Sequence, residues 1–258
     1  MQLRPLGTTG INVSPLGLGT VIFGRNQQVK YPTAFELPSD QQVSQILSLS
    51  KEIGINLIDT APAYGSSQER LGKLLPGPRD HWVIVSKVGE IFEQGQSRFD
   101  FSYDYTVQSV ETSLKTLKTD YIDVVLIHSN GDDLSILKNE GAFDALESLK
   151  QRGLIRAHGM SSKTVEGGLE VVKSMDVVMA TCNLSYNEEL PVLELAEQSG
   201  KGVLIKKGLQ SGHVDGNSGV HESMAFVFQQ PGVSSMIVGT INPEHLRAKV
   251  EVINSLGL

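Results

Sequence analysis

The chain has 258 residues, of which 40% are hydrophobic and 20% charged, and it carries a net charge of −7 at pH 7. This mixture excludes a mostly disordered chain, a collagen and a coiled coil. An acidic chain without a basic block is also a poor candidate for binding nucleic acid or an anionic membrane. The single cysteine, Cys182, excludes an internal disulfide and a Cys-rich metal site. The chain lacks a signal-peptide core and any run of about 20 apolar residues, so we expect a cytoplasmic protein.

The chain begins with a segment from Leu3 to Ser14 that places Gly-Thr-Thr-Gly between two short extended pieces, which predicts a β-hairpin. Eight short apolar runs follow, mostly continuous, as expected for strands covered on both faces. They occupy residues 16–20, 55–60, 82–87, 122–129, 155–161, 177–183, 202–207 and 234–239. Helical signals follow each run, over residues 40–53, 66–75, 104–118, 140–152, 162–174, 188–199, 220–230 and 243–255.

Eight strand–helix units in about 250 residues predict a (β/α)8 or TIM barrel, an α/β fold. We expect one domain over residues 1–258, with the N-terminal hairpin closing the bottom of the barrel. A doubly wound open sheet is the alternative. That fold usually carries Gly-x-Gly-x-x-Gly after its first strand, and the segment Gly17-Leu18-Gly19-Thr20-Val21-Ile22 does not match it.

In a TIM barrel the active site lies at the carboxyl ends of the strands. Four polar residues follow there in order: Asp59 and Tyr64 at strand two, Lys87 at strand three and His128 at strand four. Each has a structural explanation on its own, as a turn cap, a loop aromatic, a buried lysine with a partner, or a core histidine. Because all four converge at one barrel mouth, the pattern favours a functional site.

These four residue types can together move a proton to an oxygen atom. Lys87 and Asp59 would pair across adjacent strand ends, and the positive charge of Lys87 would lower the pKa of Tyr64 from about 10. Tyr64 would then act as a general acid near neutral pH, while His128 would orient a carbonyl by hydrogen bonding. No side chain supplies electrons, so the chemistry requires a cofactor.

The motifs resemble those of the aldo-keto reductase superfamily, in particular a short bacterial-type member. The similarity covers nearly the whole chain, from LRPLGTTGINVSPLGLGT through NLIDTAPAYGSSQERLG, VIVSK, YIDVVLIH, GMSS and LSYN to IVGTINPEHLRAKVEVI. It implies a catalytic tetrad of Asp59, Tyr64, Lys87 and His128. In that tetrad Tyr64 gives a proton to a carbonyl oxygen in reduction or takes one from an alcohol in oxidation. It also implies a nicotinamide cofactor lying extended across the barrel mouth.

The resemblance also assigns cofactor-binding positions, at which the chain departs from the family pattern. Ser162 replaces an amide, Lys206 stands where an aromatic usually stacks on the nicotinamide, and an arginine after strand eight is missing. NADP remains the expected cofactor, with NAD as the alternative. The implied cofactor residues are Thr20, Ser161, Ser162, Asn183, Lys206, Lys207, Gly208, Leu209, Gly212, Gly239, Thr240, His245 and Lys249.

Candidate substrate residues follow strands one, three and four, namely Phe23, Phe92 and Asn130. The two phenylalanines could equally pack the bases of their loops. The chain stops soon after its last helix, where longer family members have a loop that helps close the pocket. We therefore expect an open pocket and a small carbonyl substrate, an aldehyde, a ketone or an aldose.

Three other functions are weighed against the reductase. A Schiff-base aldolase could use Lys87 or Lys206, and a nicotinamide-binding regulatory protein could share this fold with the tetrad intact. A metal hydrolase is disfavoured and no metal is expected, because the six histidines show neither His-x-His nor His-Glu-x-x-His spacing. A closed barrel has no free sheet edge, so we expect a monomer.

Overall fold

The computed structural model describes residues 1–32, 34–214 and 216–258, and in them eight parallel strands form a closed barrel. The hydrogen-bonded order is β10-β11-β12-β3-β4-β5-β8-β9. The strands are β3 (Leu16–Gly19), β4 (Leu57–Asp59), β5 (Val83–Val88), β8 (Ile122–His128), β9 (Ile155–Ser161), β10 (Val177–Thr181), β11 (Gly202–Lys206) and β12 (Val233–Val238). All eight lie within two residues of the predicted runs. The predicted (β/α)8 barrel is confirmed, and the open sheet is wrong.

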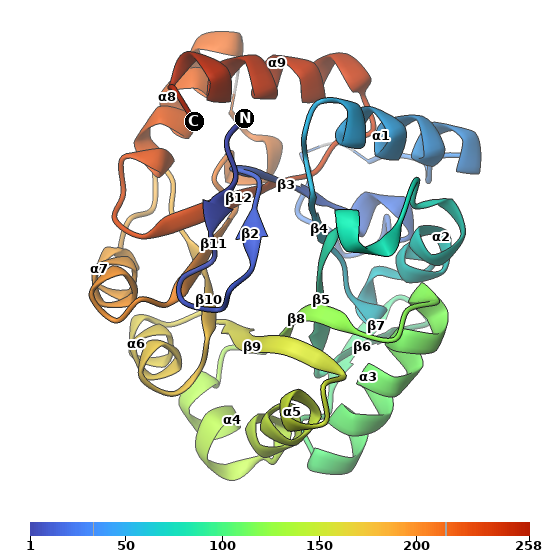
Figure 1. Ribbon diagram of the computed structural model, residues 1–258, viewed down its shortest axis with the longest axis vertical. Helices are drawn as coiled ribbons and strands as arrows, with labels where there is room; N and C mark the ends of the chain where they lie inside the picture. Colours follow the sequence, from blue (N-terminus) through green and yellow to red (C-terminus); the bar gives the residue numbers. More distant parts are fainter. Residues whose placement is uncertain (33, 215) are drawn as a thin grey trace.

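The helices form a ring outside the barrel (Figure 1). They are α1 (Asp40–Glu52), α2 (Ser67–Leu74), α3 (Tyr103–Leu117), α4 (Asp133–Asn139), α5 (Ala142–Gln151), α6 (Val165–Ser174), α7 (Leu190–Gln198), α8 (Gly216–Phe228) and α9 (Pro243–Ser255). Ser39 caps α1 as predicted, and its hydroxyl accepts from Gln42 N in a capping box. The short helix α4 was not predicted.

The N-terminal hairpin, β1 (Arg4–Pro5) and β2 (Asn12–Val13), crosses the middle of the barrel (Figure 1). Its apolar side chains Leu6, Ile11 and Val13 are buried in one cluster with barrel-interior residues such as Leu57 and Val177. Burial of each such side chain contributes about 1.5–3 kcal/mol. The hairpin therefore closes one end of the barrel, as predicted, and leaves the carboxyl ends of the strands as the mouth.

A second hairpin, β6 (Glu90–Glu93) and β7 (Gln96–Phe99), follows β5 and was not predicted. Its turn places Gln94 and Gly95 at φ values of 51° and 76°. Two consecutive residues with positive φ are typical of the two-residue turn that joins antiparallel strands. The dipeptide Gln-Gly is a weaker signal for this turn than Asn-Gly, which explains the omission.

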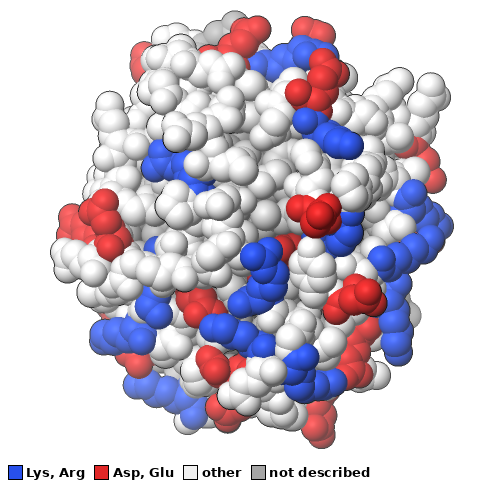
Figure 2. Space-filling view, viewed as in Figure 1, with Lys and Arg blue, Asp and Glu red and all other residues white. Residues whose placement is uncertain are grey.

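The face of the molecule that carries the N-terminal hairpin shows acidic and basic side chains interspersed (Figure 2). No helix in the described part of the chain is long and apolar enough to cross a membrane. Nor do the described residues bring together a group of three or more His, Cys, Asp or Glu side chains that could hold a metal ion.

Candidate active site

Three of the four predicted tetrad residues come from neighbouring strands. Asp59 is the last residue of β4, Lys87 lies near the end of β5, and His128 is the last residue of β8. These strands pair in parallel as β4-β5-β8, so their carboxyl ends lie side by side at the mouth. Tyr64 follows in a short 3-10 helix, Pro62–Tyr64. The structure thus brings the four predicted residues to one edge of the barrel.

Lys87 and Asp59 form an ion pair that is almost entirely removed from water. The lysine Nζ donates to Asp59 Oδ1 at 2.5 Å and to the carbonyl of Thr60 at 3.1 Å. The two side chains are only 2% and 6% exposed. Burial acts to lower the pKa of Lys87, but the charge of Asp59 in direct contact outweighs it, and the pKa is raised. Lys87 therefore stays an ammonium ion.

Tyr64 lies beside this ion pair, with Lys87 Nζ 4.7 Å from the centroid of its ring. Burial raises the pKa of Tyr64 to about 12, and the charge of Lys87 only partly opposes that rise. The prediction that Lys87 brings the tyrosine pKa below 10 is therefore wrong for the protein without ligands. Desolvation of the phenolate outweighs the attraction of the ammonium. Tyr64 is a phenol at neutral pH.

Two glycines, Gly24 and Gly65, allow a close backbone contact that fixes the position of the turn carrying Tyr64. A Cβ on Gly65, whose φ is +58°, would lie 2.1 Å from the carbonyl oxygen of Gly24, and a Cβ on Gly24 would lie 2.3 Å from the carbonyl oxygen of Tyr64. Only glycine at both positions permits this close approach of two backbones. The segment after β3 therefore fixes where the tyrosine turn lies.

His128 faces Tyr64 edge-on, with 6.3 Å between ring centroids, and is 22% exposed. On its other side, Nδ1 lies 2.8 Å from Oε2 of Glu90, without the alignment of a hydrogen bond. Burial lowers the pKa of His128, and the Glu90 carboxylate offsets only part of that. Sequence reasoning missed Glu90 because it lies in the unpredicted hairpin β6–β7.

Lys206, Ser161 and Ser162 also meet at the mouth. The Lys206 ammonium donates to Ser161 Oγ at 2.9 Å and to the carbonyl of Ser162 at 2.5 Å. Burial lowers its pKa to about 7, and the nearby carboxylate of Glu189 opposes that only in part. Ser162 is fully buried, and its Oγ has no hydrogen-bond partner among the described residues.

The segment after β11 carries the predicted Lys207, Gly208, Leu209 and Gly212 in a tight loop. Lys207 and Gly212 have φ values of 56° and 90°, and Gly208 packs where a Cβ would lie 2.4 Å from Met236 Sδ. The Asn183 side chain anchors this loop, because its Nδ2 donates to the Lys207 carbonyl at 3.1 Å. The Asn183 amide is therefore already engaged with the protein.

The predicted residues after β12 lie around the start of α9. Gly239 is exposed, whereas Thr240 is buried and accepts from Asn242 N at 3.1 Å. His245 is exposed, and Lys249 donates back to its carbonyl oxygen at 3.1 Å. Asn242 caps the helix by accepting from Glu244 N.

Three further predicted residues make contacts within the fold. Thr20 is fully buried, and its hydroxyl donates to the carbonyl of Asp59 at 2.9 Å. Phe23 is also fully buried in the main core. Asn130 closes a local turn by accepting from Asp132 N at 2.9 Å. A residue just past a strand end can point inward or back into the layer of helices, which the sequence does not distinguish.

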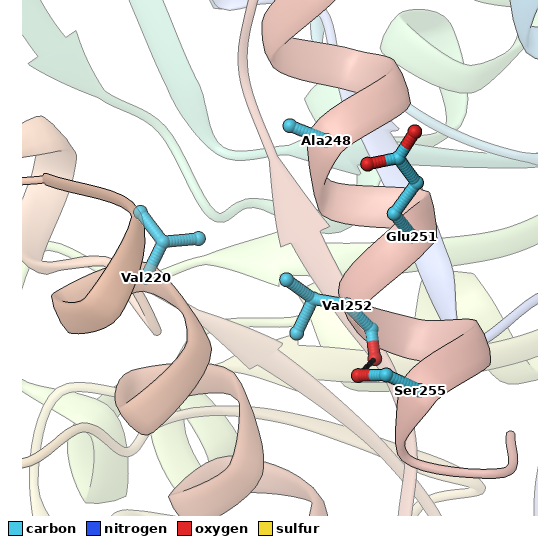
Figure 3. A pocket seen from close by; sticks show the side chains of 5 residues that line it. All are labelled: Val220, Ala248, Glu251, Val252 and Ser255. Carbon is cyan, nitrogen blue, oxygen red and sulfur yellow. Dashed lines mark hydrogen bonds between the residues drawn. The ribbon is translucent and has the colours of Figure 1, made fainter.

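A shallow groove of about 260 Å³ lies outside the barrel, between α8 and α9 (Figure 3). Val220, Ala248, Glu251, Val252 and Ser255 line it. A second hollow of about 480 Å³ lies beside the N-terminal hairpin and the C-terminus. Neither contains a residue of the predicted site.

Comparison with known proteins decides the family. The model of the Aldo/keto reductase family matches residues 15–223. The chain belongs to the aldo-keto reductase family. A crystal structure of a Pseudomonas aeruginosa protein assigned as an aldo-keto reductase superposes with a TM-score of 0.88 at 55% identity, covering 97% of this chain and 93% of that one.

Several curated relatives of this aldo-keto reductase carry named activities, and two of them illustrate the range. L-Galactose dehydrogenase of Arabidopsis thaliana is 30% identical, over 82% of this chain and 66% of its own length. NADH-specific methylglyoxal reductase of Escherichia coli is 29% identical, over 84% of this chain and 70% of its own length. Both are oxidoreductases, which supports interconversion of a carbonyl and an alcohol.

Proposed function

We propose that this aldo-keto reductase interconverts a small carbonyl compound and its alcohol, with Tyr64 as the proton donor and acceptor. The observation that carries the proposal is the buried Lys87–Asp59 ion pair beside the Tyr64 ring, with Nζ 4.7 Å from the ring centroid. A charged lysine held there favours negative charge on the phenol oxygen when its proton leaves.

In the direction of reduction, Tyr64 begins as a phenol and gives its proton to the carbonyl oxygen. Its pKa of about 12 keeps it protonated at neutral pH, so the donor form is present at full occupancy. Lys87 then stabilises the phenolate that forms, while Asp59 holds the lysine in place. In oxidation the phenolate accepts the proton, so that direction needs a form that is scarce at neutral pH.

A bound nicotinamide cofactor would supply the hydride for reduction or accept it in oxidation. Ser161 and Ser162 would hold its carboxamide, and the buried, unpartnered Oγ of Ser162 fits that role. Lys206 and Lys207 would hold the diphosphate. Thr240, His245 and Lys249 would hold the adenosine end at the start of α9. Cationic side chains and a helix N-terminus suit an anionic ligand.

NADP is the cofactor that we propose, with little discrimination against NAD. His245 and Lys249 are the side chains available for the 2′-phosphate. Glu244 is exposed in the first turn of α9, and its negative charge disfavours binding of the 2′-phosphate there. The Escherichia coli relative is itself NADH-specific.

For the substrate we propose a small aldehyde, ketone or aldose. A sugar is supported by the Arabidopsis relative, named as an L-galactose dehydrogenase. Of the three predicted substrate residues, Phe92 is the one that we propose as a wall of the pocket, since it lies on the hairpin that carries Glu90. Phe23 is fully buried, and exposed Asn130 stays a prediction.

The test combines cofactor binding with one substitution. Emission of NADPH and NADH should change on titration with the protein, and this signal is preferable to that of Trp82, which is buried at the other end of β5. Tyr64→Phe should lower turnover by about 10²–10⁴-fold while the cofactor dissociation constant stays within about twofold. Full activity in this variant, or no cofactor binding by the parent protein, would overturn the proposal.

Schiff-base chemistry is a second candidate, favoured by one observation. Lys206 has a pKa of about 7, and a lysine that loses its proton near neutral pH can attack a carbonyl. Borohydride reduction in the presence of a small aldehyde should then attach the aldehyde to Lys206. An unmodified Lys206 under those conditions eliminates this candidate.

A further inference from the structure

A buried arginine connects three segments behind the proposed reaction centre. Arg25 is 7% exposed, and its Nε donates to the carbonyl of Gln27 at 2.9 Å. Its Nη1 donates to the carbonyl of Ala63 at 3.2 Å and to Oε1 of Glu90 at 2.9 Å. Ala63 directly precedes Tyr64. One side chain thus holds the tyrosine turn and the β6–β7 hairpin together.

The other oxygen of Glu90 meets His128. Oε1 is held by Arg25 and also by Ser97 Oγ, which donates at 2.6 Å, while Oε2 lies 2.8 Å from His128 Nδ1. The Glu90 side chain is only 10% exposed. The hairpin places a fixed negative charge on one particular nitrogen of the histidine. Because Glu90 is held from two sides, it cannot turn away without breaking both contacts.

The contact constrains where the histidine carries its proton. Despite burial, the neighbouring His128 and the hydrogen bonds from Ser97 and Arg25 hold the pKa of Glu90 well below its usual range, so Glu90 is a carboxylate. A ring lone pair facing a carboxylate oxygen at 2.8 Å would be repelled by it, so the nitrogen that faces Glu90 is the one that carries the proton, even without the alignment of a hydrogen bond. Neutral His128 then has its proton on Nδ1 and a free lone pair on Nε2.

We propose that Arg25 and Glu90 form a positioning pair that fixes the tautomer and orientation of His128 and, through Ala63, its place relative to Tyr64. This inference rests on the proposed carbonyl–alcohol chemistry at the same site. The contacts of the pair are with the protein itself, including the Ala63 carbonyl, Ser97 and His128. The pair acts through His128, as carboxylates do when they orient a functional imidazole.

The fixed tautomer decides which ligand oxygen His128 can face. Nε2 of the neutral ring accepts a hydrogen bond, so it suits the hydroxyl of an alcohol or of a sugar lactol. A carbonyl oxygen has no proton to give, and it meets a donor only when the ring is protonated at both nitrogens. The alcohol should therefore bind better above the pKa of His128, and the carbonyl compound better below it.

Several charged groups act on His128 besides Glu90. Burial and the ammonium groups of Lys87 and Lys206 lower its pKa, and the Glu90 carboxylate raises it. Arg25 lies behind Glu90, Asp59 is neutralised by Lys87, and Tyr64 is a phenol at these pH values. Removing the Glu90 charge should consequently lower the pKa of His128 further.

The direct test is nuclear magnetic resonance of the intact, ligand-free protein labelled with ¹⁵N-histidine. The His128 signals are assigned with His128→Gln. Long-range proton–nitrogen correlations should show the proton of neutral His128 on Nδ1 in the parent protein. In the isosteric Glu90→Gln the pKa of His128 should fall by about one unit, equivalent to a tenfold change in proton affinity, and the tautomers should become mixed.

The chain offers a matched control in His158, whose Nε2 contacts Glu147 at 2.5 Å on the outer side of the barrel. Glu147→Gln should move the His158 signals and leave those of His128 unchanged. Glu90→Asp keeps the charge with a shorter reach, and it should restore part of the parent pKa. An unchanged tautomer and pKa of His128 in Glu90→Gln would overturn the inference.

Kinetics separate this inference from the proposed function. In the parent protein, KM for the carbonyl substrate should rise as the pH passes the His128 pKa, and in Glu90→Gln this rise should occur at lower pH. Arg25→Met, which releases Glu90, should lower kcat more than Arg25→Lys does. If the parent protein shows no turnover but its tautomer responds to Glu90→Gln, the proposed function fails and the positioning pair stands. If the parent protein turns over but its tautomer does not respond, the positioning pair fails and the proposed function stands.

Discussion

Two lysines at the same barrel mouth, Lys87 fully buried and Lys206 partly exposed, have pKa values shifted in opposite directions. Lys87, at the end of β5, donates to the Asp59 carboxylate at 2.5 Å, and its pKa is raised. Lys206, at the end of β11, donates to a hydroxyl and a carbonyl, and its pKa is lowered to about 7. Burial disfavours the charge at both positions. The difference is a carboxylate in direct contact.

The two lysines show how one mouth can carry two kinds of cation. The β4–β5–β8 side holds a permanent charge beside Tyr64, which suits stabilisation of a phenolate during proton transfer. The β9–β11 side holds Lys206, which contacts no carboxylate among the described residues. An anionic ligand placed there would act as the missing partner and raise its pKa. This arrangement is what the proposed binding of a cofactor diphosphate requires.

The largest effect is expected from removing the permanent charge. Lys87→Met should lower turnover by about 10²–10⁴-fold, because Tyr64 loses the cation that stabilises its phenolate. It should also lower the free energy of unfolding by about 3–5 kcal/mol, since Asp59 is left as a buried, unpaired carboxylate. Urea denaturation and steady-state kinetics measure the two effects. Unchanged stability would show that Asp59 does not depend on Lys87.

The double variant Lys87→Met/Asp59→Asn sharpens this result. Removing both charges should restore most of the lost stability, because no unpaired charge stays buried. Turnover should not recover. Recovery of activity in the double variant would show that the ion pair serves the fold and that Tyr64 works without it.

The ionisation of Tyr64 predicts different pH profiles for the two reaction directions. Because burial raises its pKa to about 12, the rate of alcohol oxidation should increase up to the alkaline limit of folding, about tenfold per pH unit where the phenolate is scarce. In carbonyl reduction the donor is the phenol form of Tyr64, which is already present at neutral pH, so hydride transfer in this direction should not need a lower pH to protonate Tyr64. Stopped-flow measurement of the hydride-transfer step in both directions checks this. An oxidation rate that levels off below pH 9 would contradict it.

A smaller effect is expected from the unpaired lysine. Between pH 7 and 10.5 the unfolded chain binds a proton at Lys206 that the folded chain lacks, so stability attributable to this group rises with pH across that window. Lys206→Met should therefore raise the melting temperature most at pH 6, by about 2–4 °C for each kcal/mol gained, and the gain should shrink toward pH 10.

Exposed Lys163 supplies the control for that experiment, because Lys163→Met removes a nearby cation that is not buried. Its melting temperature should change little at any pH. Equal melting-temperature changes in Lys163→Met and Lys206→Met would show that general charge reduction, rather than burial of Lys206, causes the effect.

The sequence predicted the barrel because its strands are continuous apolar runs bounded by glycine and by helical segments. It also placed Asp59, Lys87 and His128 together, since carboxyl ends of parallel strands share one edge. It did not predict Arg25 or Glu90. Glu90 lies in a polar hairpin whose Gln94-Gly95 turn is a weak sequence signal. Arg25 lies far from Glu90 in the sequence, as Glu90 does from His128, so the sequence does not show these contacts.

Burial is the property that the sequence could not show. Thr20 and Phe23 follow a strand end, and both side chains are fully buried. The expected direction of the Tyr64 pKa was wrong because the nearby lysine is visible in the sequence, whereas the cost of desolvating a phenolate is not. Burial likewise disfavours the charged form of Lys206, and because that form is a cation, its pKa is lowered. Residue types identify the groups at a site, and their solvation depends on the packed structure.

The proposed chemistry depends most on Tyr64 being a protonated phenol beside a charged lysine. The most direct measurement is the ¹³Cζ resonance of Tyr64 in the ligand-free protein, assigned with Tyr64→Phe and followed from pH 6 to 11. We predict no titration below pH 10.5, consistent with a pKa of about 12, and a still higher pKa in Lys87→Met. A Tyr64 resonance that titrates below pH 10 in the parent protein would contradict this chemistry.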